Sequence, residues 1–342
     1  MKIWIDILTP KQLLFFEPII KKLGKKYDIL CTSRSYEEVS KLAKIRNFDM
    51  IWVGKYGGGK KYAKLEASID RMKKLSLMIN EFSPNFVISF CSPEAARISF
   101  GLGINHIAFC DSPHANAVMK LTLPLVQKLL VPWIIPKKEF LKFGIDVKNI
   151  ISYKAIDASI TIKRKSNKKQ LLPFKNNYKK NILIRLEEEQ ASYASKSGNT
   201  ISIVKEIVNE FHDENIVILG RYSEQIKKLK KLFGPKIKIL KMSLDGKDLL
   251  DNTDIFIGSG GTMTAESALL GIRTISYNAI PNIVENYLVK KNLIKRETSP
   301  TKITKIIKRL LELPNDSFKI RAREITQNME DPIQKLIQLI KK

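Results

Sequence analysis

Short apolar runs alternate along the chain with longer segments whose apolar residues recur at helical spacing. The first series of apolar runs predicts strands at 2–8, 28–33, 50–54, 85–91 and 106–110. The segments between these runs predict helices at 15–26, 35–44, 60–82 and 93–103. Strands that alternate with helices are typical of a parallel sheet covered by helices on both faces.

The same alternation restarts near residue 180. The second series predicts strands at 181–187, 215–221, 237–242, 254–261 and 273–278. It predicts helices at 202–213, 223–233, 244–252 and 264–271. A chain of 342 residues is long enough for two domains with separate cores. The pattern therefore predicts an α/β fold of two doubly wound, Rossmann-like domains.

The segment 157–180 separates the two series and is polar, lysine-rich and weakly patterned, as connecting segments are. We therefore expect an N-terminal domain at 1–156, a linker at 157–180 and a second domain at 181–315. Ligands of open α/β sheets bind beyond the carboxyl ends of the strands. We expect the chemistry in a central cleft that these strand ends face.

The net charge of +26 suggests an anionic partner, and its distribution restricts which one. Lysines are spread over nearly every predicted helix, and no basic stripe is interleaved with aromatic residues. Binding of nucleic acid is therefore disfavoured. Peripheral contact with an anionic membrane surface stays open, with a solvated coat of lysines as the alternative.

The cysteines and the apolar runs indicate a cytoplasmic protein. Cys31, Cys91 and Cys110 lie in apolar stretches without a CxxC spacing, so we expect small buried hydrophobic residues in a reducing compartment. The first apolar run is too short for a signal peptide, and the longest one, 117–135, is interrupted by two lysines and two prolines. The chain has no DxD motif and no His/Cys cluster, so no metal is expected.

The stretch GSGGTMTAESALLG, 258–271, follows an apolar run and begins a predicted helix. It carries glycines that let a backbone approach a ligand, and hydroxyls beside them: Gly258, Gly260, Gly261, Thr262 and Thr264. The exposed N–H groups of a helix start suit a phosphate. A strand-to-helix turn capped by Ser259 or Thr262 explains the same residues equally well. Neither a Walker loop nor GxGxxG is present, so a mononucleotide or sugar nucleotide fits better.

At this point the sequence resembles a known superfamily. The run 239–282, ILKMSLDGKDLLDNTDIFIGSGGTMTAESALLGIRTISYNAIPN, resembles the nucleotide-binding region of the glycosyltransferase-B superfamily. The resemblance is strongest to lipid-linked-precursor N-acetylglucosaminyltransferases and UDP-N-acetylglucosamine 2-epimerases. The whole chain, with FFEPIIKKL, GKYGGGKKYAKL, AFCDSPHA and SGGTMTAESALLG, is similar to the mainly archaeal family labelled domain of unknown function 354.

The superfamily resemblance implies a nucleotide site in the second domain. It implies that Glu266, seven residues after Ser259, holds the ribose hydroxyls of UDP; the alternative is a helix acid favoured by the helix dipole. The loop it places around the nucleotide comprises Ser259, Gly260, Gly261, Thr262, Met263 and Thr264. It places Arg185 near the diphosphate, with pairing to the following acids as the alternative. Donor-sugar contacts fall on Asn282, Glu285 and Asn286, or these residues simply start a helix.

In the first domain the resemblance implies an acidic residue after the strand HIAFC, and Asp111 stands there. Asp111 and His114 are suited to act as a general acid/base pair near neutral pH. The alternative is an Asp-Ser-Pro helix start with a surface histidine. The loop GKYGGGKKY, 54–62, carries glycines and Lys60 that suit closure over a phosphate or an acceptor, or it is a mobile surface loop.

Three departures from the relatives stand out. Where the transferases carry a glycine-rich loop with a histidine, this chain has DILTPKQ at 6–12, so that role falls to Asp6 or His114. The epimerases have an aspartate where Ser92 stands here, and an arginine-rich loop where 186–188 stand. The known arrangement for epimerisation is therefore incomplete in this chain.

The leading hypothesis is glycosyl transfer from a UDP-sugar, with a UDP-N-acetylhexosamine donor, in polysaccharide, glycolipid or surface-glycan synthesis. The acceptor is a glycan, lipid or protein, and no cofactor is required. The alternatives are a UDP-N-acetylglucosamine 2-epimerase or hydrolase, and a non-catalytic protein that binds sugar nucleotides or nucleic acid. The resemblance also implies a C-terminal helix at 316–342 that crosses back to the first domain.

Overall fold

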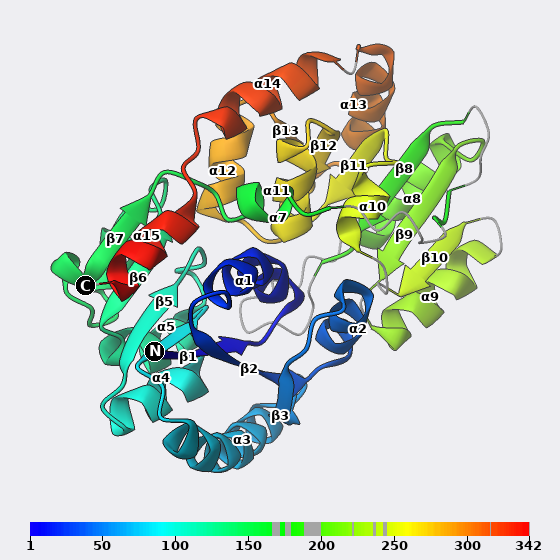
Figure 1. Cartoon of the computed structure of the whole chain (residues 1–342). Helices are drawn as coiled ribbons and strands as arrows, with labels where there is room; N and C mark the ends of the chain where they lie inside the picture. Colours follow the sequence, from blue (N-terminus) through cyan, green and yellow to red (C-terminus); the bar gives the residue numbers. More distant parts are fainter. Residues whose placement is uncertain are drawn as a thin grey trace. The chain divides into compact units, whose positions relative to one another are not determined.

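The computed structural model describes residues 1–165, 172–174, 179–187, 200–220, 222–234, 237–241, 245–314 and 316–341. These residues form two compact units. Unit 1 comprises Met1–Ile160 and the chain from Glu330 on, and unit 2 comprises the described residues from Thr161 to Met329. Each unit contains one parallel sheet with helices packed on it (Figure 1).

The sheet of unit 1 has the strand order β3-β2-β1-β4-β5-β6-β7. Its strands are β1 (Lys2–Ile7), β2 (Asp28–Ser35), β3 (Ile51–Lys55), β4 (Phe86–Ser89), β5 (Asn105–Phe109), β6 (Lys128–Pro132) and β7 (Ile150–Tyr153). Its helices are α1 (Pro10–Leu23), α2 (Glu37–Arg46), α3 (Lys61–Phe82), α4 (Pro93–Gly101), α5 (Asn116–Thr122), α6 (Lys138–Leu141) and α15 (Pro332–Ile340). The first five strands lie where the apolar runs predicted them, and β6 and β7 were not predicted.

The apolar run 117–135 contains both a helix and a strand. Helix α5 ends at Thr122, a short 3-10 turn with Pro124 follows, and β6 begins at Lys128. Within the parts of the chain that the structure describes, no helix is long and apolar enough to cross a membrane.

The sheet of unit 2 has the order β10-β9-β8-β11-β12-β13. Its strands are β8 (Asn181–Arg185), β9 (Asn215–Gly220), β10 (Lys238–Lys241), β11 (Ile255–Gly258), β12 (Arg273–Ser276) and β13 (Ile294–Arg296). Its helices are α8 (Thr200–Glu210), α9 (Ser223–Phe233), α10 (Gly246–Leu250), α11 (Thr262–Leu269), α12 (Ile283–Lys290), α13 (Pro300–Glu312) and α14 (Asp316–Gln327). All paired strands run parallel in both sheets, so the predicted fold class of two Rossmann-like domains is confirmed.

The segment expected as one helix at 316–342 is two helices, α14 and α15, and they belong to different units. Proline lacks an N–H and is favoured at the first position of a helix, so Pro332 starts a new helix. The Asp331 side chain caps this helix by accepting a hydrogen bond from the Ile333 N–H. The return to unit 1 begins where the Glu330 N–H donates to the Lys154 carbonyl at 3.0 Å.

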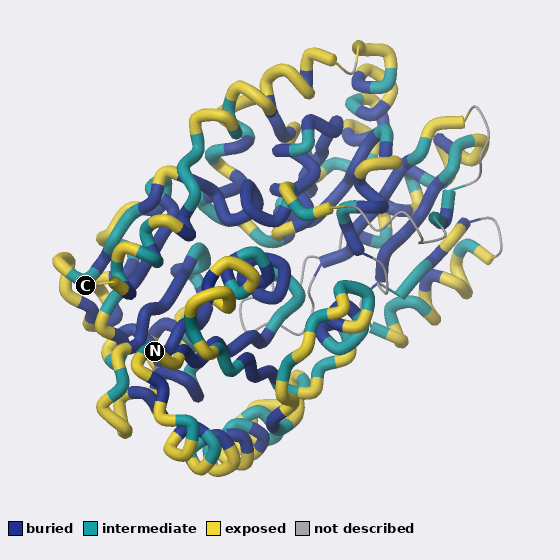
Figure 2. Tube along the Cα trace, viewed as in Figure 1, coloured by how far each residue is buried: buried dark blue, intermediate teal, exposed yellow. Residues whose placement is uncertain are grey.

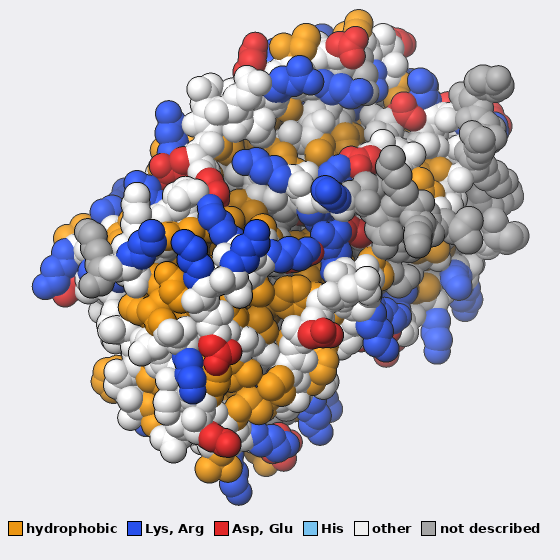
Figure 3. Space-filling view, viewed as in Figure 1, with side chains coloured by type: hydrophobic (Ala, Val, Ile, Leu, Met, Phe, Trp, Pro, Cys, Tyr) orange, Lys and Arg blue, Asp and Glu red, His pale blue; other side chains and the backbone are white. Residues whose placement is uncertain are grey.

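The central strands of both sheets are buried on both faces, as Figure 2 shows by the dark strands inside each unit. Ile3, Trp4 and Ile5 of β1 are fully buried in succession, as expected for a strand covered by helices on both sides. Cys31, Cys91 and Cys110 are buried free thiols, so the prediction that they are packed as small hydrophobic residues is confirmed. Lys and Arg side chains occur at many places on the visible face of the surface (Figure 3).

The strand orders fix where each unit can form a ligand crevice. In unit 1 the order reverses between β1 and β4, and in unit 2 it reverses between β8 and β11. At such a switch point the connections from adjacent strands leave on opposite sides of the sheet, which opens a crevice at the carboxyl ends. The glycine turn at 258–261 directly follows β11 and therefore lies at the switch point of unit 2.

Candidate functional site

The glycine turn between β11 and α11 requires glycine at one position and leaves open space at another. Gly260 has φ +98°, and a Cβ built there would lie 2.9 Å from the Ile280 carbonyl oxygen and still closer to the Glu285 carboxylate. A Cβ built on Gly261 meets nothing within 4 Å. Gly260 therefore shapes the turn, whereas Gly261 borders free space at the start of the helix.

Two predicted site residues stabilise this turn from within. The Thr264 hydroxyl is 2% exposed and accepts a hydrogen bond from the Gly260 N–H at 3.3 Å. The Asn282 amide donates to the carbonyls of Gly260, at 2.6 Å, and Ile280, at 2.9 Å. Its oxygen caps α12 by accepting from the Glu285 N–H at 2.8 Å. Asn282 therefore caps the start of α12, and its contact with a donor sugar stays a prediction.

Helix α11 begins without a side-chain cap. Its N-cap residue is Gly261, and neither Ser259 nor Thr262 accepts a hydrogen bond from the first turn, so the alternative of a turn capped by one of these hydroxyls is wrong. Thr262 is exposed, whereas Ser259 and Met263 are buried beside the turn. An uncapped helix start has N–H groups directed outward and a positive dipole end, and both favour an anion.

Glu266 lies one turn into α11, is 4% exposed and is already held by two donors. The Thr161 hydroxyl donates to it at 2.5 Å and the Arg164 guanidinium at 3.2 Å. Arg164 also donates to the buried Asp245 at 2.9 Å. Burial alone would lower the pKa of Arg164, but the two carboxylates raise it above its usual value. The carboxylate of Glu266 is therefore fixed in one orientation before any ligand binds.

Thr161 and Arg164 were missed because they fall in the segment 157–180 that was expected to be a linker. Arg164 is the only arginine among the many lysines of that segment. A guanidinium is preferred over an ammonium for paired contacts with buried carboxylates. The single arginine in this lysine-rich segment was therefore the sequence feature that could have indicated a contact with buried carboxylates.

Arg185 ends β8 and lies at the switch point of unit 2, and its contact with a diphosphate stays a prediction. The first of the acids that follow it, Glu187, accepts from the hydroxyls of Tyr277 at 2.8 Å and Thr200 at 2.6 Å. The next two acids, 188 and 189, lie outside the described residues. Asn286 is exposed, and its side chain accepts from Arg296 at 2.6 Å.

In unit 1 the predicted Asp111 is part of a cluster of four residues, which we call the Lys11 cluster: Lys11, Asp111, Tyr153 and Asp157. Lys11, in the first turn of α1, forms ion pairs with Asp111 and, at 2.8 Å, with Asp157. The Tyr153 hydroxyl donates to the other oxygen of Asp157 at 2.5 Å. Asp111 follows β5 and Asp157 follows β7, so the parallel sheet brings these strand ends together.

The two carboxylates of the Lys11 cluster differ in exposure and in pKa. The Asp111 side chain is 21% exposed and that of Asp157 1%. Burial raises the pKa of Asp111, but the charge of Lys11 and the hydrogen bonds from Lys11 and Ser112 together hold it below its usual value. For Asp157, burial dominates and raises the pKa to about 6 despite Lys11. Asp111 is thus the ionised and accessible carboxylate of the pair.

Three other titratable groups of unit 1 differ in their access to a ligand: the candidates His114 and Asp6, and His106. His114 is half-buried; burial lowers its pKa and the charge of Asp111 partly offsets this, so its imidazole is neutral at pH 7. His106 is fully buried between Ser89 and Ser99, and burial lowers its pKa to about 3. Asp6 is fully buried, so its proposed role as a ligand-contacting residue is wrong, which leaves His114.

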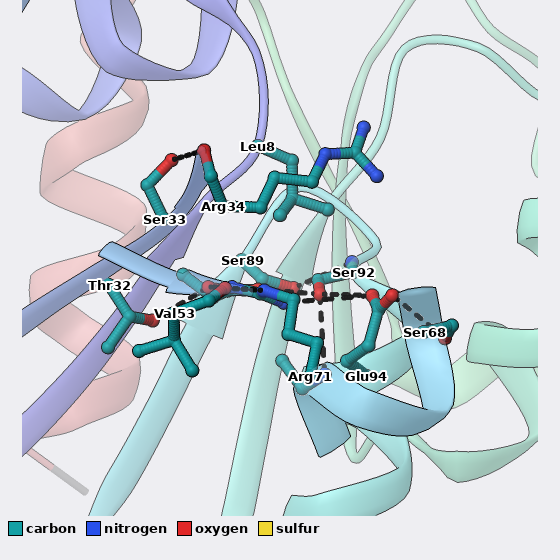
Figure 4. Close-up of polar contacts among 12 residues, drawn as sticks. Leu8, Thr32, Ser33, Arg34, Val53, Ser68, Arg71, Ser89, Ser92 and Glu94 are labelled. Carbon is teal, nitrogen blue, oxygen red and sulfur yellow. Dashed lines mark hydrogen bonds and ion pairs between the residues drawn. The ribbon is translucent and has the colours of Figure 1, made fainter. Parts of the chain in front are cut away.

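Asp6 instead organises a buried network at the switch point of unit 1 (Figure 4). Its carboxylate accepts from Arg71 at 2.6 Å, from Ser92 at 2.7 Å and from Thr32 at 2.7 Å. Arg71 donates in addition to the Val53 carbonyl at 3.0 Å. These paired, buried charges join β1, β2 and β3 to helix α3 and to the start of α4. Among the residues that the structure describes, no group of three His, Cys, Asp or Glu side chains is placed to hold a metal ion.

Both units thus have the Rossmann-like architecture that defines the fold of the glycosyltransferase-B superfamily, and the sequence places the chain within one family. The chain belongs to the DUF354 family, described as protein of unknown function, which it matches over residues 1–342. An uncharacterized protein of Methanocaldococcus jannaschii is 29% identical over 97% of this chain and 95% of its own.

Solved structures with the same fold include enzymes of two kinds. The UDP-GlcNAc 2-epimerase of Neisseria meningitidis, bound to UDP-GlcNAc, has a TM-score of 0.77 at 17% identity, with 100% of each chain covered. The spinosyn rhamnosyltransferase SpnG has a TM-score of 0.66 at 11% identity, again with 100% of each chain covered. At these identities the likeness establishes the fold.

Proposed function

We propose that this protein is an enzyme that binds a UDP-sugar in unit 2 and transfers the sugar to an acceptor. The observation that carries the proposal is the uncapped start of α11 at the switch point, with open space at Gly261 and the fixed carboxylate of Glu266 one turn further on. The fold shared with an epimerase bound to UDP-GlcNAc supports a ligand of the same class.

The parts of the proposed nucleotide site have separate tasks. The first N–H groups of α11 bind the diphosphate, aided by the dipole of the helix and by the charge of Arg185. Glu266 accepts hydrogen bonds from the ribose hydroxyls. A carboxylate offers about four lone-pair sites. Thr161 donates one hydrogen bond and Arg164 donates two, at 3.2 and 3.5 Å, so about one site is left for the ribose while the carboxylate is held in place.

The proposed reaction is displacement at the anomeric carbon of the sugar, with a UDP-N-acetylhexosamine as donor. The acceptor hydroxyl forms a bond to that carbon and loses its proton to Asp111 or His114. The bond between the carbon and the diphosphate oxygen breaks, and UDP leaves as an anion stabilised by the α11 helix start. Asp111 is suited to receive a proton because the Lys11 charge keeps it ionised.

A UDP-GlcNAc 2-epimerase or hydrolase is the second candidate, favoured by the structural likeness to the Neisseria meningitidis epimerase. Such an enzyme consumes a UDP-sugar without an acceptor, whereas a transferase releases UDP only when an acceptor is present. Incubation of the protein with UDP-N-acetylglucosamine alone, followed by analysis of the sugar nucleotide, separates the two reactions.

The nucleotide site is tested by calorimetric titration with UDP, UMP, GDP, TDP and NAD. We expect selective binding of UDP and at least about tenfold weaker binding by Glu266→Gln, because a hydrogen bond to a charged group contributes about 1.5–3 kcal/mol. Gly261→Ala places a methyl group where the diphosphate would bind and should weaken binding by a similar factor. Glu312→Gln removes the same charge at an exposed position of unit 2 and should bind UDP as the wild type does.

The melting temperature of each unliganded variant shows whether it is folded, so a lost affinity is not mistaken for a lost structure. Equal affinity for all the nucleotides, or unchanged UDP affinity in both Glu266→Gln and Gly261→Ala, would refute the proposed site.

A further inference from the structure

The loop GKYGGGKKY at 54–62 has no part in the proposed nucleotide site, and the structure places a charged side chain against it. Arg34, near the end of β2, lies with its guanidinium carbon 4.8 Å from the ring centre of Tyr56. The Tyr56 ring in turn packs 4.9 Å from the ring of Tyr36. A guanidinium that lies over an aromatic ring can still donate hydrogen bonds to another partner, because its N–H groups point outward in the plane of the guanidinium.

The pairing of β2 with β3 is irregular beside Arg34. Ser33 pairs with Trp52 and Ser35 with Lys55, so two residues of β3 oppose Arg34 alone. One of these two is Gly54, with φ +71°, where a Cβ would lie 2.9 Å from the Cβ of Arg71. Bulges of this kind bend a strand and re-aim side chains, and they are common beside functional sites.

The Arg34 guanidinium has no acceptor in the described part of the chain. Its Nε atom is buried and has no hydrogen-bond partner. Figure 4 shows the guanidinium directed away from the buried Asp6 network, with no interaction drawn to it. The nearby Glu94 is already engaged with the Ser68 hydroxyl, at 2.9 Å, and with Arg71. A half-buried, unpaired guanidinium carries a desolvation cost that a bound anion would remove.

The loop that carries Tyr56 is held firmly against unit 1. The Tyr56 N–H donates to the Ser35 carbonyl at 3.1 Å. A Cβ on Gly57 would lie 2.5 Å from the Ala63 carbonyl oxygen, so this glycine packs directly on the first turn of α3. Gly58, with φ +69°, has open space around its Cβ position. The ring beneath Arg34 is therefore fixed, while the neighbouring glycine leaves room for a small group.

We propose that Arg34, stacked on Tyr56 at the carboxyl edge of the unit 1 sheet, binds an oxyanion, a phosphate or a carboxylate, carried by the acceptor substrate. That the anion belongs to an acceptor substrate rests on the transfer reaction proposed above. The binding of the anion itself does not depend on that reaction. Guanidinium forms paired hydrogen bonds with both kinds of oxyanion.

The test uses the full chain labelled with ¹⁵N-arginine and follows the Nε–Hε signal of Arg34 by NMR. The signal is assigned by its loss in Arg34→Lys. Sodium phosphate and sodium acetate are titrated separately, without nucleotide, so the outcome does not depend on UDP binding. We expect a saturable shift with one of the two anions, and that anion identifies the substrate group as phosphate or carboxylate.

Three variants define the site. Tyr56→Leu should weaken the binding of the anion about two- to fivefold, because the aromatic ring beside Arg34 is lost, whereas Tyr56→Phe should leave the affinity unchanged. Arg97→Met removes one positive charge from an exposed position on α4 and should leave the titration unchanged. No shift with either anion, or an equal shift at the exposed Arg97 signal, overturns the proposal, because the second result would show only general attraction to a basic surface.

Discussion

At the residue scale, the Lys11 cluster shows how one ammonium group makes two carboxylates unequal. Lys11 contacts both Asp111 and Asp157, and the more buried of them, Asp157, is the one whose pKa rises to about 6. Like charges in one site disfavour ionisation of both, and burial decides which carboxylate gives way. The accessible carboxylate, Asp111, is therefore ionised, whereas the buried carboxylate of Asp157 holds its proton up to a higher pH.

This inequality predicts a pH dependence of folding stability. The folded protein binds the Asp157 proton more tightly than the unfolded chain does, because the folded pKa lies above the ordinary 3.8. The contribution of Asp157 to the free energy of unfolding is therefore full below about pH 4 and falls as the pH rises through about 6. Asp157→Asn lacks this titration, so its stability relative to the wild type should increase by about 1–3 kcal/mol from pH 4 to pH 7.

Urea denaturation at several pH values measures this difference. Asp146→Asn, at an exposed position of unit 1, is the matched control and should follow the wild-type pH profile. A difference between Asp157→Asn and the wild type that stays constant, or that moves in the opposite direction, would contradict the assignment.

The residues of this cluster show what the sequence revealed at this scale. Asp111 was predicted because it directly follows an apolar strand and matches the resemblance. Lys11 and Asp157 were not predicted, because 146 residues separate them in the sequence. In the structure the Lys11 ammonium and the Asp157 carboxylate meet at 2.8 Å. Their contact exists only because β1 and β7 end at the same edge of one sheet, and the order of strands in that sheet cannot be read from periodicity.

At the element scale, the turn between β11 and α11 contains two neighbouring glycines with opposite tasks. The conformation of the turn requires glycine at position 260, because its φ of +98° and its close neighbours exclude a side chain. Gly261 lies at φ −83° with open space, so neither the backbone nor the packing excludes a side chain there.

This contrast predicts that two similar substitutions have different effects. Gly260→Ala should lower the free energy of unfolding by about 2 kcal/mol or more, through backbone strain and steric overlap with Glu285 and Ile280. Gly261→Ala should change it by less than about 1 kcal/mol while it weakens UDP binding. Thermal unfolding of the two variants, combined with the UDP titration, provides the measurement. Equal losses of stability would show that both glycines serve only the turn.

Most elements were predicted because their periodicity is clear, and the exceptions have physical causes. β6 was hidden in the apolar run 117–135, where helix and strand residues are equally apolar and no glycine separates them. β7 (Ile150–Tyr153, IISY) and β13 (Ile294–Arg296, IKR) were also not predicted, because each has too few apolar residues in succession to form a clear apolar run. The expected helix at 316–342 ignored Pro332, which starts a new helix rather than continuing the old one.

At the scale of the whole molecule, the described residues of unit 1 come from two separate stretches of sequence. The chain leaves it near Ile160 and returns at Glu330, and α15 completes it. Ile333, Leu336 and Ile340 of α15 are buried, while Gln338 on the same helix is exposed. Figure 1 draws α15 beside β6 and β7, consistent with the hydrogen bond between Glu330 and Lys154, the residue after β7.

The assignment of α15 to unit 1 predicts where a core substitution acts. Leu336→Ala should destabilise unit 1 by about 2–5 kcal/mol, as expected for a fully buried leucine, and leave unit 2 unaffected. Native-state hydrogen exchange measures this directly, through faster exchange of β7 amides and unchanged exchange of β12 amides. Gln338→Ala is the matched control. Faster exchange in β12 as well would mean that the two units unfold together.

The broad distribution of lysines belongs to this scale too, and contact with an anionic membrane stays a prediction. Figure 3 shows basic side chains over much of the visible face, which fits a solvated coat as well as a docking surface.

The split of unit 1 also sets the order in which the protein is completed during synthesis. Every residue of unit 2 leaves the ribosome before α15 does. Unit 2 is therefore completely synthesised before unit 1, although most of unit 1 precedes it in the sequence. At 5–20 residues per second, the chain between Ile160 and Glu330 takes roughly 10–30 s to make. During that interval the place of α15 on unit 1 is uncovered, and the nascent chain displays there the apolar surface that chaperones recognise.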